Sequence, residues 1–188
     1  MPLTAGFFER DAAEVAPALV GVTLLVNGIG GVIVETEAYD REDPASHAHA
    51  GPTARNAAMF GPPGRAYVYR SYGLHWCLNF VCREAGHGAG VLIRALQPTH
   101  GLDLMRARRG LPEGCDERLL CAGPGRLGQA LAITREAHDG VRLDRPPFRL
   151  IPAIGGPLHV TATPRIGIRK AADVPWRFVW TGSRYASR

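Results

Sequence analysis

The sequence predicts a single domain that combines β-strands and α-helices. Its 188 residues, of which 46% are hydrophobic, suffice for one domain with a buried core. Several segments alternate apolar and polar residues with a period of two and are joined by glycine-containing turns, as strands are. Other segments carry apolar residues at helical spacing. Because no repeat, low-complexity tract or long linker divides the chain, we expect one domain over residues 1–188.

The most informative strand covers residues 33–39, Ile-Val-Glu-Thr-Glu-Ala-Tyr. Its alternation places Glu35, Glu37 and Tyr39 on one face and small or apolar residues on the other. Two carboxylates and a phenol on one face fit one wall of a polar pocket. They also fit a solvated sheet face, where charged residues are ordinary.

Five local elements are expected before residue 61: a helix over 5–20, a strand over 22–26, a turn over 27–31, a loop over 40–52 and a short helix over 53–60. Pro17 should interrupt the first helix and Gly21 should end it. Thr53 is expected to cap the second helix. His47 and His49 could bind a metal, but no third ligand lies nearby, so we expect no metal site.

An aromatic-rich hairpin is predicted over residues 66–80, with Ser71, Tyr72 and Gly73 at its tip. A tyrosine at an exposed tip is unfavourable for solubility but suits insertion between stacked bases. Tyr67 and Tyr69 share a strand face, and core packing is the preferred interpretation for Tyr67.

The second half of the chain begins with a predicted strand over 90–96, ended by Gln97 and Pro98. Arg94 in this apolar strand should be paired, and Glu37 is an obvious partner. Helices are expected over 102–109, 117–120 and 127–133, and a strand pair over 141–151. The glycine-rich segment 122–126 with Arg126 suggests a phosphate site, although it is not a P-loop because the Lys-Ser/Thr pair is missing.

Charge and cysteine usage narrow the function classes. The net charge is +5, carried almost entirely by arginine, with Lys170 the only lysine, so a polyanionic partner is plausible. A high-GC genome would also favour arginine. The four cysteines form no Cys-x-x-Cys pair and are expected to be free thiols. We expect no membrane span, no secretory signal and a cytoplasmic protein, associated with the nucleoid if the source is bacterial.

An ordered set of motifs covers nearly the whole chain: Val-Glu-Thr-Glu-Ala-Tyr at 34–39, Arg-Asn at 55–56, Met-Phe at 59–60, Tyr-Val-Tyr-Arg-Ser-Tyr-Gly at 67–73, Asn79, Leu-Ile-Arg-Ala-Leu at 92–96, Gly-Pro-Gly-Arg-Leu-Gly-Gln-Ala-Leu at 123–131 and Pro-Arg-Ile-Gly-Ile at 164–168. With these motifs the sequence resembles the alkyladenine (3-methyladenine, methylpurine) DNA glycosylase family. The resemblance implies a mixed α+β fold, a single compact domain with a curved antiparallel β-sheet core flanked by helices. It also implies base-excision repair without a cofactor, acting as a monomer on double-stranded DNA with damaged purines.

The resemblance also implies a role for each matching residue. Glu37 would be the general base, and Arg94 with the backbone carbonyl of Ile166 would help to hold the attacking water. Tyr39 and Tyr69 would sandwich the extruded base, His47 would complete the pocket, and Asn79 would discriminate against guanine. Tyr72 would fill the gap in the duplex. The expected contacts to the DNA backbone come from Arg55, Gly123, Gly125 and Arg126.

Two other function classes stay open from the residues alone. Glu35 and Glu37, two apart on a strand, lie roughly 7 Å apart, which suits the carboxylate pair of an inverting sugar glycosidase. The basic composition also suits a nucleic-acid-binding module without catalysis.

With only one lysine, Lys170, and no amine nucleophile assigned, we expect a monofunctional enzyme that leaves an abasic site.

Overall fold

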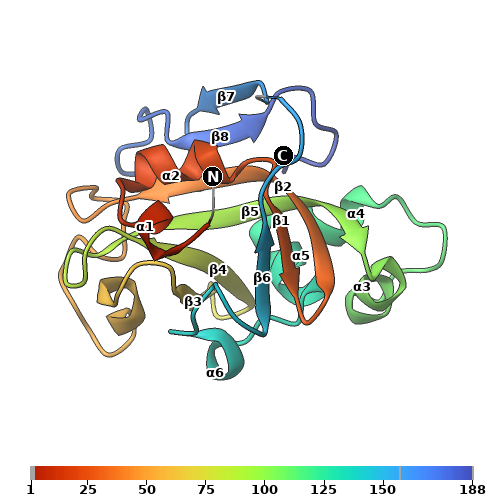
Figure 1. Cartoon of the computed structure of the whole chain (residues 1–188), viewed down its shortest axis with the longest axis horizontal. Helices are drawn as coiled ribbons and strands as arrows, with labels where there is room; N and C mark the ends of the chain where they lie inside the picture. The colour runs from red at the N-terminus through yellow and green to blue at the C-terminus, as the bar shows by residue number, and fades with distance from the viewer. Residues whose placement is uncertain (1–2, 157, 188) are drawn as a thin grey trace.

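The computed structural model describes residues 3–156 and 158–187. Its strands are β1 (Thr23–Val26), β2 (Ile29–Tyr39), β3 (Ala66–Ser71), β4 (His75–Cys82), β5 (Ala89–His100), β6 (Phe148–Ile151), β7 (Val160–Thr163) and β8 (Arg177–Trp180). The helices are α1 (Ala5–Phe8), α2 (Ala12–Leu19), the 3-10 helix η1 (Ala57–Phe60), α3 (Leu102–Arg109), α4 (Arg118–Cys121), α5 (Pro124–Ala130) and α6 (Arg135–His138). The strands form one antiparallel sheet that curls into a half-barrel (Figure 1), so the predicted mixed α+β fold is confirmed.

Strand β2 is the centre of this sheet, because three other strands pair with it. It pairs with β5 along one edge. On the other edge its first half pairs with β1 and its second half, Glu35 to Glu37, pairs with β8. The register with β5 is irregular between Ile33 and Thr36, as at a β-bulge. Glu35 and Glu37 therefore lie where β2, β5 and β8 meet.

Helices cover the sheet and complete the core. Thr36 on β2 points toward α2, where its hydroxyl donates a 2.9 Å hydrogen bond to the carbonyl of Ala16. Helix α5 rests on β4 so closely that a Cβ atom at Gly128 would lie 2.2 Å from the carbonyl oxygen of Trp76. Glycine at this position thus allows the approach, and residues 122–126 line one pocket together with His75 of β4 and Arg94 of β5.

Several predicted elements in the first half are confirmed and two are corrected. The turn Asn27–Gly28 joins β1 and β2 as a two-residue hairpin, with φ angles of 50° and 80°. The single helix over 5–20 is wrong: the chain forms two helices, and Pro17 lies inside α2, whose last turn closes through the Val20 amide and the Pro17 carbonyl. The helix expected from 53 begins only at Ala57, and Thr53 instead hydrogen-bonds to the Asn56 side chain.

The hairpin tip at Tyr72 is confirmed, and so is the helix over 102–109 in the second half of the chain. Strand β5 continues beyond the expected stop, and Pro98 lies opposite Gly31 beside an irregularity where a missing amide is tolerated. Helix α5 begins at Pro124 instead of 127 and ends at Ala130. Of the strand pair expected over 141–151, only Phe148–Ile151 is a strand. Strands β7 and β8 were not predicted.

Candidate active site

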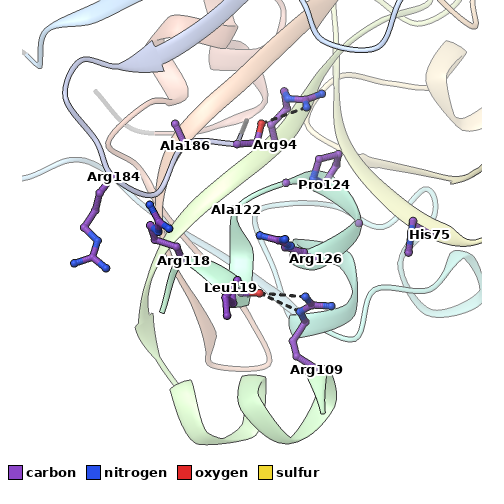
Figure 2. A pocket seen from close by; sticks show the side chains of 13 residues that line it. His75, Arg94, Arg109, Arg118, Leu119, Ala122, Pro124, Arg126, Arg184 and Ala186 are labelled. Atoms are coloured by element: carbon purple, nitrogen blue, oxygen red, sulfur yellow. Dashed lines mark hydrogen bonds between the residues drawn. The ribbon is translucent and has the colours of Figure 1, made fainter. Parts of the chain in front are cut away.

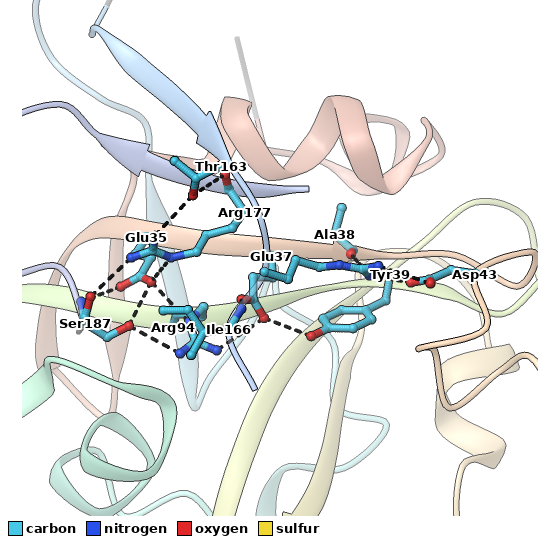
Figure 3. Close-up of polar contacts among 11 residues, drawn as sticks. Glu35, Glu37, Ala38, Tyr39, Asp43, Arg94, Thr163, Ile166, Arg177 and Ser187 are labelled. Carbon is cyan, nitrogen blue, oxygen red and sulfur yellow. Dashed lines mark hydrogen bonds and ion pairs between the residues drawn. The ribbon is translucent and has the colours of Figure 1, made fainter. Parts of the chain in front are cut away.

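Glu37 is a fully buried carboxylate at the centre of a cluster of polar side chains (Figure 3). Its Oε2 atom accepts hydrogen bonds from the Tyr39 hydroxyl at 2.8 Å and from Nη1 of Arg94 at 3.2 Å. Its Oε1 atom accepts a 2.8 Å hydrogen bond from the backbone amide of Ile166. The predicted pairing of Glu37 with Arg94 is therefore present.

Glu35 is equally buried, and its partners differ. Its Oε1 atom accepts hydrogen bonds from Nε of Arg94 at 3.1 Å and from Nε of Arg177 at 2.6 Å. The Ser187 hydroxyl donates to the same oxygen at 2.8 Å, and the Ser187 amide donates to Oε2 at 2.6 Å. Four donors thus converge on Glu35, which is an arrangement for holding a carboxylate in place.

Arg94 joins the two carboxylates. Burial alone would lower the pKa of Arg94, but the Glu37 and Glu35 carboxylates outweigh it and raise that pKa. The guanidinium therefore stays charged, and it neutralises part of the negative charge that two buried glutamates bring into the core.

A narrow aromatic slot adjoins this cluster. It has a volume of about 120 Å³ and is lined by Tyr39, Ala45, His47, Met59, Tyr67, Tyr69, Asn79 and Ile168. All four residues predicted to bind a base, namely Tyr39, His47, Tyr69 and Asn79, belong to its lining. Tyr39 connects the two features, because its ring lines the slot while its hydroxyl is bonded to Glu37.

His47 enters the slot from the loop between β2 and η1. Its Nδ1 atom lies 3.1 Å from the Tyr67 hydroxyl, and its ring centroid lies 4.4 Å from that of Tyr69 in an edge-on arrangement. The side-chain amide of Asn56 donates a 2.8 Å hydrogen bond to the His47 carbonyl, which fixes the loop. Burial, and then the positive charge of Arg55, lower the pKa of His47, so the ring is neutral at pH 7.

The phenols of the slot remain protonated at neutral pH. Burial, followed by the charge of Glu37, raises the pKa of Tyr39, and burial raises the pKa of Tyr69. Burial likewise raises the pKa of Tyr67 to about 12. Tyr67 is buried against Met59 and Val81, as the core-packing interpretation predicted, but it also lines the slot.

A buried ion pair supports the back of the slot. Arg165 and Asp43 form a salt bridge, and their side chains are 0% and 2% exposed. The guanidinium carbon of Arg165 lies 4.7 Å from the ring centroid of Tyr39 and 5.4 Å from that of Trp176. It also donates a 3.0 Å hydrogen bond to the Ala38 carbonyl. Arg165 therefore fixes the Tyr39 ring from behind.

Tyr72 stands at the tip of the β3–β4 hairpin. Its side chain is 88% exposed, and its φ angle of 50° lies in the left-handed region. Tyr69 on β3 lines the aromatic slot, whereas His75 on β4 lines a second pocket, so the hairpin adjoins both. Arg55 lies beside the hairpin and donates a 3.2 Å hydrogen bond to the Arg70 carbonyl.

The second pocket, which we call the arginine-rich pocket, has a volume of about 660 Å³ (Figure 2). Its lining contains Arg94, Arg109, Arg118, Arg126 and Arg184, together with Gly123, Gly125, His75 and Ser187. Burial, and then the neighbouring charge of Arg126, lower the pKa of Arg109. Such a concentration of guanidinium groups favours an anion. Of the residues predicted to contact the DNA backbone, Gly123, Gly125 and Arg126 lie here, and Arg55 does not.

Sequence reasoning missed several residues of the site. Arg177 and Ser187 reach it from segments far along the chain, and no local pattern marked them. Asp43 and Arg165 were given no role, although Arg165 belongs to the Pro-Arg-Ile-Gly-Ile motif. The contact of the Ile166 amide with Glu37 was not predicted either, and the role of the Ile166 carbonyl in holding the water stays a prediction. Lys170 is exposed on the surface.

Two further properties concern the described residues, 3–156 and 158–187. Within them, no three His, Cys, Asp or Glu side chains gather as a metal site would require. No helix in this part of the chain has the length and apolar character needed to cross a membrane.

The fold and the site together fit the class of DNA glycosylases, which process a base taken out of the helix. The family model described as "Methylpurine-DNA glycosylase (MPG)" matches residues 6–184. The chain therefore belongs to the methylpurine-DNA glycosylase family. Its class is that of hydrolases that act on N-glycosyl bonds in the base-excision repair of alkylated DNA.

Curated relatives carry a matching name. A protein of Nitrosospira multiformis is 63% identical over 181 residues, which are 96% of this chain and 91% of the relative. One from Rhodopseudomonas palustris strain HaA2 is 62% identical over 186 residues, 99% of this chain and 90% of its own. One from Rhizobium meliloti is 58% identical over 183 residues, 97% and 94% respectively. Each is named "Putative 3-methyladenine DNA glycosylase".

Proposed function

We propose that the protein hydrolyses the N-glycosidic bond of flipped, damaged purines in double-stranded DNA. The substrates would be 3-methyladenine and 7-methylguanine, extending to hypoxanthine and ethenoadenine. One observation carries the proposal: Tyr39 both lines the aromatic slot and donates a 2.8 Å hydrogen bond to the buried Glu37. A base stacked on Tyr39 would have its sugar next to this carboxylate.

In the proposed reaction, Glu37 is the general base. It accepts a proton from a water molecule whose oxygen forms a bond to C1′ of the deoxyribose, while the bond from C1′ to the base nitrogen breaks. The electron pair of the broken bond leaves with the purine, which a positive charge on an alkylated purine favours. Arg94 and the carbonyl of Ile166 would orient the water, and the Ile166 amide supports this role by fixing Glu37.

The slot would hold the extruded base between Tyr39 and Tyr69. Stacking on aromatic faces favours a cationic base through cation–π attraction, and the neutral His47 ring adds no opposing charge. Asn79 would exclude guanine by crowding its 2-amino group. Its side-chain amide donates a 3.2 Å hydrogen bond to the Tyr67 carbonyl, which supports a fixed orientation.

Flipping the base leaves a gap in the duplex, which Tyr72 would fill. Its exposure at a hairpin tip that adjoins both pockets supports this role. Phosphates of the strand would bind Arg126, Gly123 and Gly125 in the arginine-rich pocket, and Arg55 would bind a phosphate beside the hairpin.

We further propose that the enzyme is monofunctional and leaves an intact abasic site. A lyase needs an amine nucleophile, and the exposed Lys170 is not among the residues that line the aromatic slot. The amine of Met1 lies outside the described residues. Residues 1–188 would act as one glycosylase domain and as a monomer.

The sugar-glycosidase alternative loses support because the four donors on Glu35 leave it poorly placed to activate water or protonate a leaving group.

The test is Glu37→Gln, assayed by single-turnover release of base from duplexes that each carry one defined lesion. We expect the rate to fall by about 10²–10⁴, the usual contribution of a general base, while binding of lesion DNA changes little. Glu14→Gln, at an exposed carboxylate on α2, is the matched control and should retain full activity. Near-normal turnover by Glu37→Gln would exclude Glu37 as the base, and loss of DNA binding would assign it a structural role.

A further inference from the structure

The four side chains Glu35, Arg177, Ser187 and Arg94 form one continuous network next to Glu37, and all but the partly buried Arg177 are buried (Figure 3). They come from β2, β8, the segment after β8, and β5. Three of them, Glu35, Arg177 and Ser187, have no part in the proposed reaction. Buried ion pairs are weak contributors to stability because of their desolvation cost, so a role in stability alone is a poor account of this network.

We propose that Glu35, Arg177 and Ser187 are positioning residues, which hold the Arg94 guanidinium in the orientation that serves Glu37 and the attacking water. This inference rests on the proposed roles of Glu37 and Arg94. It assigns to Glu35 a function distinct from that of its neighbour on the strand, and it gives the segment that carries Ser187 a place in catalysis.

The first argument is that every nitrogen of the Arg94 guanidinium has a different acceptor. Nε donates to Glu35 at 3.1 Å, Nη1 donates to Glu37 at 3.2 Å, and Nη2 donates to the Ser187 hydroxyl at 3.3 Å. Three acceptors around a planar group fix both its position and its plane. Because a guanidinium has five N–H donors, one hydrogen on Nη1 and one on Nη2 remain for water or substrate.

The second argument is that the acceptors are themselves fixed. Arg177 donates to Glu35 at 2.6 Å, to the Ser187 carbonyl at 3.2 Å and to the Thr163 hydroxyl at 3.1 Å. Ser187 contacts Glu35 through both its amide and its hydroxyl. The segment after β8 is thereby fastened to β2, and Arg94 is held against a frame built from three strands.

The third argument is that the network connects the two pockets. Arg94 and Ser187 line the arginine-rich pocket, and Arg94 also contacts Glu37 beside the aromatic slot. A displaced Ser187 would release Nη2 of Arg94 toward the arginine-rich pocket, where an anion would attract it. The hydroxyl of Ser187 therefore keeps Arg94 directed at the reaction and away from bound phosphate.

Charge gives the inference a specific signature. The charged and titratable groups around Glu37 are Glu35 and Tyr39 on β2, Arg94 on β5, Arg177 on β8 and Arg165 beside Ile166. Asp43 neutralises Arg165, and the two glutamates balance Arg94 and Arg177. Replacing Glu35 by glutamine leaves one excess positive charge, so the guanidinium groups of Arg94 and Arg177 would repel each other without the carboxylate between them. Arg94 should then lose its orientation, and base release should slow.

The main test is Ser187→Ala, which keeps the amide contact to Glu35 and removes the contacts of the hydroxyl to Arg94 and to Glu35. We expect single-turnover base release to slow about tenfold, as loss of the charge-assisted hydrogen bond to Arg94 would give, with lesion-DNA affinity unchanged within twofold. Ser187→Thr restores the hydroxyl and should recover most of the rate. The matched control is Ser183→Ala, whose hydroxyl contacts only the Tyr185 amide within the described residues and should not affect the rate.

A normal rate in Ser187→Ala, or a loss that threonine does not rescue, would overturn the inference. So would a Glu35→Gln enzyme that folds and keeps the normal rate, because Glu35 would then not be needed to hold Arg94. Ser187→Ala decides the question alone if Glu35→Gln does not fold. Glu37→Gln separates the two proposals. If this variant remains active, the proposed function fails. The positioning inference fails only if the Ser187 or Glu35 variants give the contrary results named above.

Discussion

The buried pair of Arg165 and Asp43 should be one of the most sensitive points of the structure. Asp43→Asn preserves the shape of the side chain and removes its charge, so that Arg165, which cannot lose its proton, remains as an uncompensated cation. The Arg165 side chain is 0% exposed. Its other hydrogen-bond acceptors are the carbonyls of Ala38 and Ala171. Breaking a buried pair on one side costs about 3–5 kcal/mol of the free energy of unfolding.

This loss is measurable by urea denaturation and by thermal melting. The midpoint temperature of thermal unfolding changes by about 2–4 °C per kcal/mol for a chain of this size, so it should fall by roughly 6–20 °C. Asp11→Asn is the matched control, because it breaks the exposed pair with Arg83, whose side chains are 31% and 55% exposed. The control should cost at most about 1 kcal/mol. A loss for Asp43→Asn no larger than that of the control would refute the reasoning.

Three further variants test the proposed site. Tyr72→Ala should slow excision from duplex DNA and matter much less on single strands, where no stack has to be refilled; equal losses on both would make Tyr72 merely structural. Asn79→Ala should raise the release of undamaged guanine from DNA, and an unchanged guanine background would remove Asn79 from discrimination. Borohydride treatment on lesion DNA should trap no covalent adduct, and an adduct that disappears in Lys170→Ala would overturn the monofunctional assignment.

Local patterns predicted the parts of the fold that depend on neighbours in the chain. The hairpin at Asn27–Gly28 follows from the left-handed backbone that these residues accept, and helix α3 follows from its periodicity. Pro17 was expected to interrupt the first helix. A proline removes only one amide donor, however, and α2 tolerates that loss near its last turn. Strands β7 and β8 escaped notice because they have four residues each and pair through a long connection.

The same distinction applies to the site. Alternation on β2 placed Glu35, Glu37 and Tyr39 on one face, and an apolar strand with one charge predicted the pairing of Arg94. Arg177 and Ser187 lie 142 and 152 residues from Glu35 in sequence. Their contacts depend on how β8 and the following segment return to β2, which no local period records. The amide of Ile166 illustrates the same limit, because only the folded chain shows that it donates to Glu37.

The two glutamates of β2 show how one strand can assign different roles to identical residues. Alternation gives both the same face, but their neighbours differ. Glu35 meets two arginines and both polar groups of Ser187, whereas Glu37 meets one arginine, a tyrosine hydroxyl and a backbone amide. The four donors on Glu35 occupy the lone pairs with which it would accept a proton. With fewer cationic partners and a position beside the aromatic slot, Glu37 is the better placed of the two to accept a proton.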